Sequence, residues 1–258
     1  MHFLESICRN KQEEVALQQK ALPLSEIKTL LSSQSRKKVS FKQSLLESDT
    51  GIIAEFKRKS PSKGWINKEA DVRQVVKSYE EAGAAAISCL TDEQFFGGSI
   101  DDFKAARETI KSIPLLRKDF ILNLYQIFQS KLIGADVILL IAACLKAEEI
   151  VRFTAVAHEL DMEVLLEIHD ETELASICPD VDVVGINNRN LSNFVTDIST
   201  SFDLVNRIPD KFLKISESGL SSAEILAKLR QAGFRGFLMG ESFMSSGNPG
   251  RALRLLAH

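Results

Sequence analysis

The sequence has few aromatic residues other than phenylalanine, no excess of basic residues and no long apolar run. It holds 1 Trp, 2 Tyr and 15 Phe, which gives no stacking signature for nucleic-acid bases. The 32 Lys and Arg are balanced by 35 Asp and Glu, for a net charge of -3, and this argues against a surface that wraps nucleic acid. No apolar stretch approaches the roughly 20 residues of a membrane span. We therefore expect neither a nucleic-acid partner nor a membrane partner, while a local basic pocket for a small anion stays open.

Cysteine is also scarce, and its spacing lacks the pattern of a metal site. Cys8, Cys89, Cys144 and Cys178 lie far apart in the sequence and form no paired metal-ligand motif. The histidines show no ligand spacing either, and neither His158 nor His169 is a strong catalytic candidate. Because the first 20 residues are too charged to contain the apolar part of a secretory signal, we expect a cytoplasmic chain. We expect buried structural thiols, no metal and no cofactor.

Two regions of the chain differ in their pattern of polar and apolar residues. Residues 1–48 are polar and helix-like, and Pro23 and the stretch Ser32–Ser35 break them into short helices. From Gly51 onward, short apolar runs alternate with loops and segments of helical period. A chain of 258 residues with 45% hydrophobic residues has the size of one α/β barrel. We expect a single domain, with an N-terminal helical extension over 1–48 and a barrel over 49–258.

Apolar runs and helical segments alternate eight times. The predicted strands are 51–56, 85–90, 114–117, 135–141, 162–168, 182–187, 212–216 and 236–240. The predicted helices are 68–82, 99–111, 123–133, 146–160, 171–177, 199–207, 221–232 and 248–256. This order predicts the α/β class and a (β/α)8 TIM barrel, whose parallel strands are covered on both faces and therefore nearly all apolar. An open doubly wound sheet is the alternative, but it normally has a Gly-rich phosphate turn after its first strand, and here that strand ends in charged residues.

Active-site groups of such a barrel come from the carboxyl ends of its strands. Glu55 and Lys57 follow the first strand two residues apart, so they point to the same side of an extended segment. This pair suggests acid/base chemistry or anion binding, although a solvated salt bridge is the alternative. Lys118 follows a buried run, and a desolvated lysine beside another cation can donate a proton near neutral pH. The same lysine could instead form a Schiff base.

Polar residues also follow the later strands. Glu167 lies in an apolar strand, where burial raises a carboxyl pKa and a nearby lysine lowers it, so its ionisation state stays open, as does a purely structural role. Asn187 and Arg189 suit a carboxylate or phosphate, although Asn-rich segments also form turns. The small residues of 216–219 and 239–242 expose backbone N–H groups near helix N-termini, where barrels commonly bind phosphate. Together these positions suit an anionic, sugar-phosphate-like substrate.

Eight stretches that run in order from Gly51 to the end of the chain resemble the indole-3-glycerol-phosphate synthase family. They are IIAEFKRKSPSKG (52–64), LTDEQFFGGS (90–99), LLRKDFILNLYQI (115–127), GADVILLIAACL (134–145), LLEIHDETEL (165–174), VGINNRNL (184–191), ISESGL (215–220) and LMGESFM (238–244). Residues 1–48 are similar to the family's N-terminal extension in length and character. Since the sequence ends after one barrel, we expect the monofunctional form.

The resemblance implies a ring closure in tryptophan biosynthesis. The substrate would be 1-(2-carboxyphenylamino)-1-deoxyribulose 5-phosphate, a sugar phosphate that carries an anthranilate group. The products would be indole-3-glycerol phosphate, carbon dioxide and water, formed by general acid/base catalysis in a carboxy-lyase. We expect a monomer or weak homo-oligomer. Two other classes stay open: a different phosphate-binding barrel, such as an isomerase or a Schiff-base aldolase, and a barrel that binds phosphorylated metabolites without catalysis.

The resemblance also implies roles for individual residues. Lys118 would be the general acid, Glu167 a base, Lys57 a second proton donor, Glu55 a holder of the lysines and Asn187 an orienting group. Ser218 is counted with this reacting set and also with a phosphate cradle. That cradle would further include Gly219, Gly240 and Glu241. The residues implied near the anionic groups are Ser60 and Arg189, and those implied as walls for the anthranilate ring are Phe96, Phe120 and Leu140.

Overall fold

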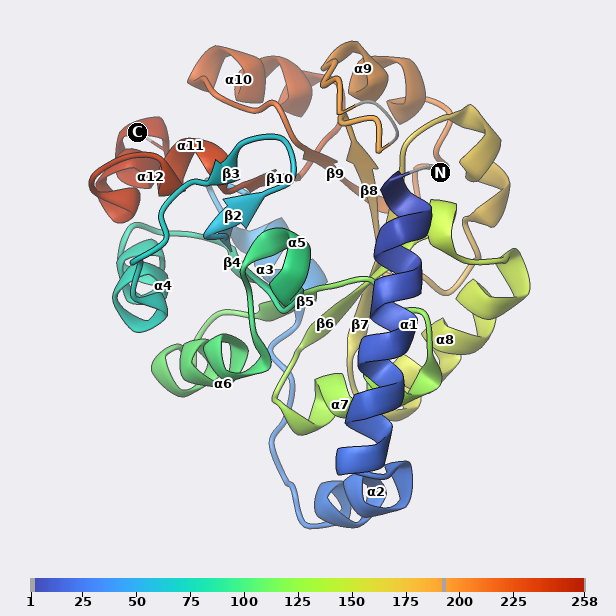
Figure 1. Ribbon diagram of the computed structural model, residues 1–258. Coiled ribbons are helices and arrows are strands. Elements are labelled where there is room, and N and C mark those ends of the chain that lie inside the picture. The colour runs from blue at the N-terminus through green and yellow to red at the C-terminus, as the bar shows by residue number, and fades with distance from the viewer. Residues whose placement is uncertain (1–2, 192–193, 258) are drawn as a thin grey trace.

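The computed structural model describes residues 3–191 and 194–257, which form a closed barrel of parallel strands surrounded by helices (Figure 1). The barrel strands are β1 (Ile52–Phe56), β4 (Ala86–Leu90), β5 (Leu115–Lys118), β6 (Val137–Ile141), β7 (Glu163–Ile168), β8 (Val183–Asn187), β9 (Leu213–Glu217) and β10 (Gly236–Met239). Strand β1 pairs with β4 on one side and with β10 on the other. The (β/α)8 barrel is thereby confirmed, and the open sheet is excluded because the barrel closes.

One helix on the outside of the barrel follows each of its strands. These helices are α4 (Val72–Glu81), α6 (Ile100–Thr109), α7 (Leu124–Leu132), α8 (Ala147–Glu159), the 3-10 helix η2 (Glu171–Ser176), α9 (Ser199–Val205), α10 (Ala223–Gln231) and α12 (Pro249–Ala257). The segment predicted as a helix over 171–177 forms a short 3-10 helix that ends at Ser176. Pro179 disfavours helical backbone at Cys178, two residues beyond that end. Ser222 caps α10 by accepting the N–H of Ile225. None of the helices in the described ranges is long and apolar enough to cross a membrane.

Five short elements at the strand ends were not predicted. They are β2 (Lys59–Ser60), β3 (Gly64–Trp65), α5 (Glu93–Phe96), the 3-10 helix η1 (Ala142–Cys144) and α11 (Glu241–Met244). Strands β2 and β3 form an antiparallel hairpin, and Asp92 caps α5 by accepting the N–H of Phe95. Each of these elements has six residues or fewer, too short for a periodicity to show in the sequence.

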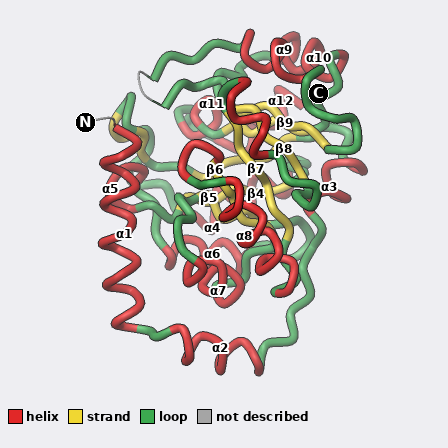
Figure 2. Tube along the Cα trace, turned by 90° about the vertical axis from the view of Figure 1, so that its right-hand side faces the viewer, coloured by secondary structure: helices red, strands yellow, loops and turns green. Residues whose placement is uncertain are grey.

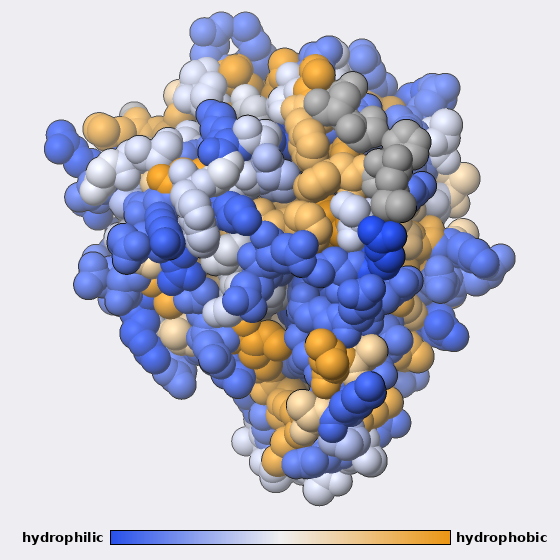
Figure 3. All heavy atoms as spheres, in the orientation of Figure 1, coloured by the Kyte–Doolittle hydropathy of each residue, from blue (hydrophilic) through white to orange (hydrophobic). Residues whose placement is uncertain are grey.

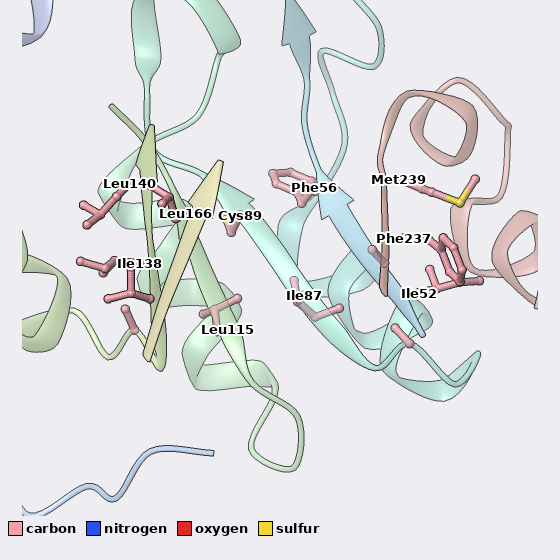
Figure 4. Packing of buried hydrophobic residues seen from close by; sticks show 14 of the residues in the cluster. Ile52, Phe56, Ile87, Cys89, Leu115, Ile138, Leu140, Leu166, Phe237 and Met239 are labelled. Carbon is pink, nitrogen blue, oxygen red and sulfur yellow. The ribbon is translucent and has the colours of Figure 1, made fainter. Parts of the chain in front are cut away.

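Side chains of the barrel strands alternate between two apolar layers, because successive residues of a strand point to opposite faces. On β6, Val137, Leu139 and Ile141 belong to the cluster inside the barrel. Ile138 and Leu140 belong to the layer between the barrel and its helices, where Figure 4 shows them with other residues of that cluster. The inward series of several strands ends in polar side chains at the carboxyl end.

Three helices precede the barrel: α1 (Phe3–Ala21), α2 (Leu24–Ser32) and α3 (Phe41–Glu47). Pro23 separates α1 from α2, as predicted. Helix α1 lies on the same face as α5 and the β2–β3 hairpin, and α3 lies on the opposite side (Figures 1 and 2). There Phe41 and Leu45 pack into the barrel interior and close the end at which the strands begin.

A buried ion cluster anchors α1 to the barrel. The Nζ atom of Lys11 lies 3.1 Å from Oδ2 of Asp92, 2.9 Å from Oδ1 of Asp119 and 2.8 Å from Oε2 of Glu14. Asp92 and Asp119 follow β4 and β5. Burial alone would lower the pKa of Lys11, but these carboxylates raise it above its ordinary value. The position of α1 over this end of the barrel is therefore fixed by charge as well as by apolar packing.

The cysteines are only partly as expected. Cys89 and Cys178 are buried, whereas Cys8 and Cys144 are partly exposed, so the prediction of buried thiols is wrong for those two. The Sγ atoms of Cys8, on α1, and Cys144, on η1, lie 3.8 Å apart. This proximity joins segments 136 residues apart in sequence, so no local spacing could have indicated it.

Candidate active site

A cavity of about 510 Å³ opens at the carboxyl ends of the barrel strands. Apart from Leu140, all the predicted site residues line it: Glu55, Lys57, Ser60, Phe96, Lys118, Phe120, Glu167, Asn187, Arg189, Ser218, Gly219, Gly240 and Glu241. Helix α1 adds Phe3, Leu4 and Ile7 to the wall. Figure 3 shows apolar surface beside the N-terminal end of α1, set among mainly hydrophilic residues. The cavity thus combines an apolar side with a polar floor.

The prediction that Leu140 lines the cavity is wrong. Leu140 is buried between the barrel and its outer helices, while its neighbours Leu139 and Ile141 line the cavity instead. The cause is the two-residue period of the strand, which sends adjacent side chains to opposite faces. The other two expected walls do face each other, since the ring centroids of Phe96 and Phe120 lie 6.1 Å apart with the rings tilted by 37°.

The polar floor of the cavity is a set of paired carboxylates and ammonium groups. The Nζ atom of Lys57 lies 2.7 Å from Oε1 of Glu55, so these two side chains do share one side, as predicted. The Nζ atom of Lys118 lies 2.9 Å from Oε2 of Glu167 and 3.7 Å from Oε2 of Glu217. The three carboxyl groups come from β1, β7 and β9. Only the closure of the barrel brings them together.

These contacts decide the protonation of the floor. Burial would lower the pKa of Lys118, but Glu167, Glu217 and Glu55 raise it above its ordinary value. The expectation of a lysine that titrates near neutral pH is therefore wrong, because Lys118 faces anions rather than another cation. The neighbouring Arg117 points into the outer layer, where it bonds to Asp119.

Two neighbouring carboxyl groups have opposite pKa shifts. Burial would raise the pKa of Glu167, but Lys118 and His169 hold it well below its usual value. Burial raises the pKa of Glu217 to about 8, helped by the charge of Glu167 and opposed by Lys118. At neutral pH the floor therefore holds a carboxylate, a carboxylic acid and an ammonium group within contact distance. Such a set can both accept and donate protons.

The rim of the cavity is basic and hydrogen-bonding. Asn187 donates from Nδ2 to Oε1 of Glu167 at 3.2 Å and accepts the backbone N–H of Arg189. The guanidinium of Arg189 donates to Oγ of Ser62 at 2.6 Å and lies 3.6 Å from Oε2 of Glu241. Glu241 is also paired with Lys63 at 2.6 Å. The two rim cations, Arg189 and Lys63, therefore contact the same carboxylate from Glu241.

Small residues bring backbone close to the cavity after β9 and β10. Ser218 and Gly219 have positive φ angles of 69° and 75°. A Cβ on Gly219 would lie 2.7 Å from Cγ2 of Thr196, and one on Gly240 would lie 2.8 Å from Cβ of Glu55. The hydroxyl of Ser60 is buried without a hydrogen-bond partner among the described residues. A phosphate that enters here would meet backbone N–H groups rather than side chains.

Comparison with known proteins gives the family of the chain. Residues 4–256 match the family described as indole-3-glycerol phosphate synthase. The chain belongs to the indole-3-glycerol phosphate synthase family. An indole-3-glycerol phosphate synthase of Bacteroides thetaiotaomicron is 49% identical over 252 residues, covering 98% of this chain and 96% of that protein. Proteins of the same name from Delftia acidovorans and Magnetococcus marinus are 41% and 44% identical, covering 98% and 99% of this chain and 98% of each relative.

Two polar residues of this family member were missed by sequence reasoning. Glu217 ends β9 just as Glu167 lies near the end of β7, so the rule that led to Glu167 could also have found Glu217. His169 follows Glu167 by two residues, the same offset as Lys57 from Glu55, and its position in a predicted loop hid this relation. The apolar wall from α1 gave no signal, since the sequence does not show where the extension packs.

Proposed function

We propose that this chain catalyses the conversion of 1-(2-carboxyphenylamino)-1-deoxyribulose 5-phosphate to indole-3-glycerol phosphate, carbon dioxide and water, within tryptophan biosynthesis. The observation that carries the proposal is the contact of Lys118 with Glu167 on the floor of a cavity with an apolar aromatic wall. Family membership supports it. Ring closure requires the substrate to fold back on itself, and a shaped pocket lowers that barrier by orientation.

Lys118 is the proposed general acid. Its raised pKa keeps it as an ammonium group, which protonates the ribulose carbonyl oxygen as the aromatic ring attacks the carbonyl carbon. The new carbon–carbon bond leaves the ring non-aromatic. Release of carbon dioxide then returns its bonding electrons to the ring. This step needs an acid aimed at one oxygen and no cofactor.

The second half of the reaction is a dehydration. The hydroxyl group formed from the carbonyl leaves as water, and this requires a proton donor and a base. Glu167 is the proposed base, because its lowered pKa keeps it ionised and able to accept a proton. Lys57 is the proposed donor, held by Glu55. Glu217 supplies a further neutral acid beside Lys118.

Binding is assigned to the rim and walls. We place the phosphate at the backbone of Ser218, Gly219, Gly240 and Glu241, beside Ser60. Arg189 faces an anionic group of the substrate, and Asn187 orients the reacting part through its contact with Glu167. Phe96 and Phe120 enclose the anthranilate ring, with Leu139 in the place expected for Leu140.

The test is a continuous indole-fluorescence assay with the proposed substrate, comparing the wild type with Lys118→Ala. Loss of a general acid should lower turnover about 100- to 10,000-fold with a smaller change in KM. Lys104→Ala is the matched control, because Lys104 is an exposed lysine on α6. A folded wild type without turnover, or a Lys118→Ala variant with normal turnover, would refute the assignment.

A second arm separates this reaction from an aldolase. If Lys118 formed a Schiff base, borohydride in the presence of substrate would modify the protein irreversibly. The general-acid mechanism predicts no such modification, which intact-mass measurement detects directly.

A further inference from the structure

A second hollow, of about 590 Å³, opens beside the proposed reaction cavity. Its lining includes His169, Asp170 and Glu173, and it shares Asn187 and Leu191 with the reaction cavity. The wall between the two hollows therefore carries Glu167 on one side and Glu173 on the other. His169 lies between these two carboxylates.

The imidazole of His169 contacts both carboxylates through different ring nitrogens. Its Nε2 lies 3.1 Å from Oε1 of Glu167, at ion-pair distance but without the angle of a hydrogen bond, and its Nδ1 lies 3.3 Å from Oε2 of Glu173. The same Oε2 of Glu173 accepts the backbone N–H of His169 at 2.8 Å. With only 9% of its side chain exposed, the ring is held from two sides and by its own backbone.

The groups around the imidazole set its charge. Glu173 of η2 and Asp170, which precedes η2, face it. Cys144 lies near both glutamates from η1, and beyond Glu167 lie Lys118 of β5 and Glu217 of β9. Burial would lower the pKa of His169, but its contacts with Glu167 and Glu173 raise it to about 10. The ring is therefore an imidazolium at neutral pH.

Glu167 receives a different contact on each oxygen. Oε2 accepts from Lys118 at 2.9 Å, while Oε1 meets Asn187 at 3.2 Å and His169 at 3.1 Å. Because both oxygens of the Glu167 carboxylate have contacts, the geometry fixes Oε2 as the oxygen that faces Lys118, the proposed acid. A displacement of about 1 Å at such a position can lower a rate about 100-fold.

We propose that His169 and Glu173 form a positioning pair that orients Glu167 and keeps it ionised. This inference rests on the proposed function, in which Glu167 acts as base. His169 does not line the reaction cavity among the described residues, so it acts through Glu167. Glu173 acts one step further out, by holding the imidazole and its positive charge.

The pair predicts a particular pH dependence. An opposite charge within about 4–6 Å lowers a carboxyl pKa by roughly 1–3 units. In His169→Asn, the acid limb of kcat/KM should therefore move to higher pH by about one unit or more, and kcat should fall about 10- to 100-fold. The change in KM should be smaller, because the phosphate and ring contacts remain.

Glu173→Gln separates charge from simple packing. Without Glu173, the pKa of His169 should fall, although Glu167 still raises it, so the ring stays charged at pH 6 and loses more of its charge by pH 9 than it does in the wild type. This variant should therefore resemble the wild type at pH 6 and come closer to His169→Asn at pH 9. A structural role alone would not produce such a crossover. His158→Asn is the matched control, since His158, on α8, pairs with Asp182 and lines neither hollow.

The experiment is the pH profile of kcat/KM and kcat for these four proteins, together with an NMR titration of the His169 ring in wild type and Glu173→Gln. We expect the shifted acid limb, the crossover, and a lower His169 pKa in Glu173→Gln. If the wild type is active and folded His169→Asn has the same pH profile, the positioning pair is overturned and the proposed function stands. A wild type without turnover would refute the proposed function itself. The NMR titration needs no activity, so an unchanged His169 pKa in Glu173→Gln would overturn the pairing in either case.

Discussion

The buried acid Glu217 provides a test of the electrostatics of the floor by stability alone. Its pKa is about 8 in the folded protein, against an ordinary value of 4.5. The folded state therefore binds this proton more tightly than the unfolded state does. The stability contributed by the bound proton is fully present below about pH 4.5 and is lost as pH rises toward 8.

The expected size follows from the shift. Each pH unit between the two pKa values removes up to about 1.4 kcal/mol from the free energy of unfolding. From pH 6 to pH 8 the loss due to Glu217 is about 2 kcal/mol, since the titration levels off as pH nears 8. Glu217→Gln replaces the acid with a neutral group of the same shape and removes this loss. The variant should therefore gain stability relative to the wild type, by about 2 kcal/mol over these two units.

The assay is urea unfolding of both proteins at pH 6, 7 and 8, followed by circular dichroism. Taking the difference between them cancels the titration of the groups that do not interact with Glu217. Glu80→Gln is the control. Partial burial would raise the pKa of Glu80, but hydrogen bonds from Ser112 and Lys77 lower it below its ordinary value. Glu80 stays ionised in both the folded and the unfolded state between pH 6 and pH 8. The difference in free energy of unfolding between the wild type and Glu80→Gln should therefore not change with pH. A constant difference for Glu217→Gln would refute the reasoning.

Three further predictions concern the buried ion cluster of Lys11, the proposed phosphate site at Gly219, and the alternation of side chains along β6. Lys11→Met should destabilise the fold by about 3–5 kcal/mol, because it leaves the buried carboxylate of Asp92 without its ion-pair partner and removes one of the two cations that contact Asp119. Urea unfolding measures this, and an unchanged midpoint would contradict it. Gly219→Ala should raise KM far more than it lowers kcat, since its φ is +75° and its Cβ would meet a side chain at 2.7 Å; equal losses in both would count against a binding role. Leu140→Ala should lower the free energy of unfolding by about 2–5 kcal/mol and leave KM unchanged, whereas Leu139→Ala should raise KM. Thermal unfolding and steady-state kinetics measure these effects. A raised KM in Leu140→Ala with an unchanged KM in Leu139→Ala would contradict the assignment.

The order of strands and helices was set by local pattern, and so it could be predicted. Apolar runs such as 135–141 are typical of strands covered on both faces, and their alternation with helical segments leaves few topologies. The positions of Glu55, Lys118 and Glu167 followed from the same reasoning, because the carboxyl ends of barrel strands meet in one place. The two-residue period could also have placed Leu139 rather than Leu140 in the cavity.

Protonation and long-range contact were decided by the tertiary structure. Whether Lys118 faces a cation or an anion depends on which side chains the closed barrel brings beside it, and the answer reversed the expected direction of its pKa shift. The opposite shifts of Glu167 and Glu217 arise from groups on different strands. The packing of α1 over the mouth, through Lys11, joins segments about a hundred residues apart in sequence. The sequence alone determined the barrel and where its polar residues gather, because those follow from local periodicity. Distances between groups remote in sequence, and the charges that depend on them, exist only once the chain has closed.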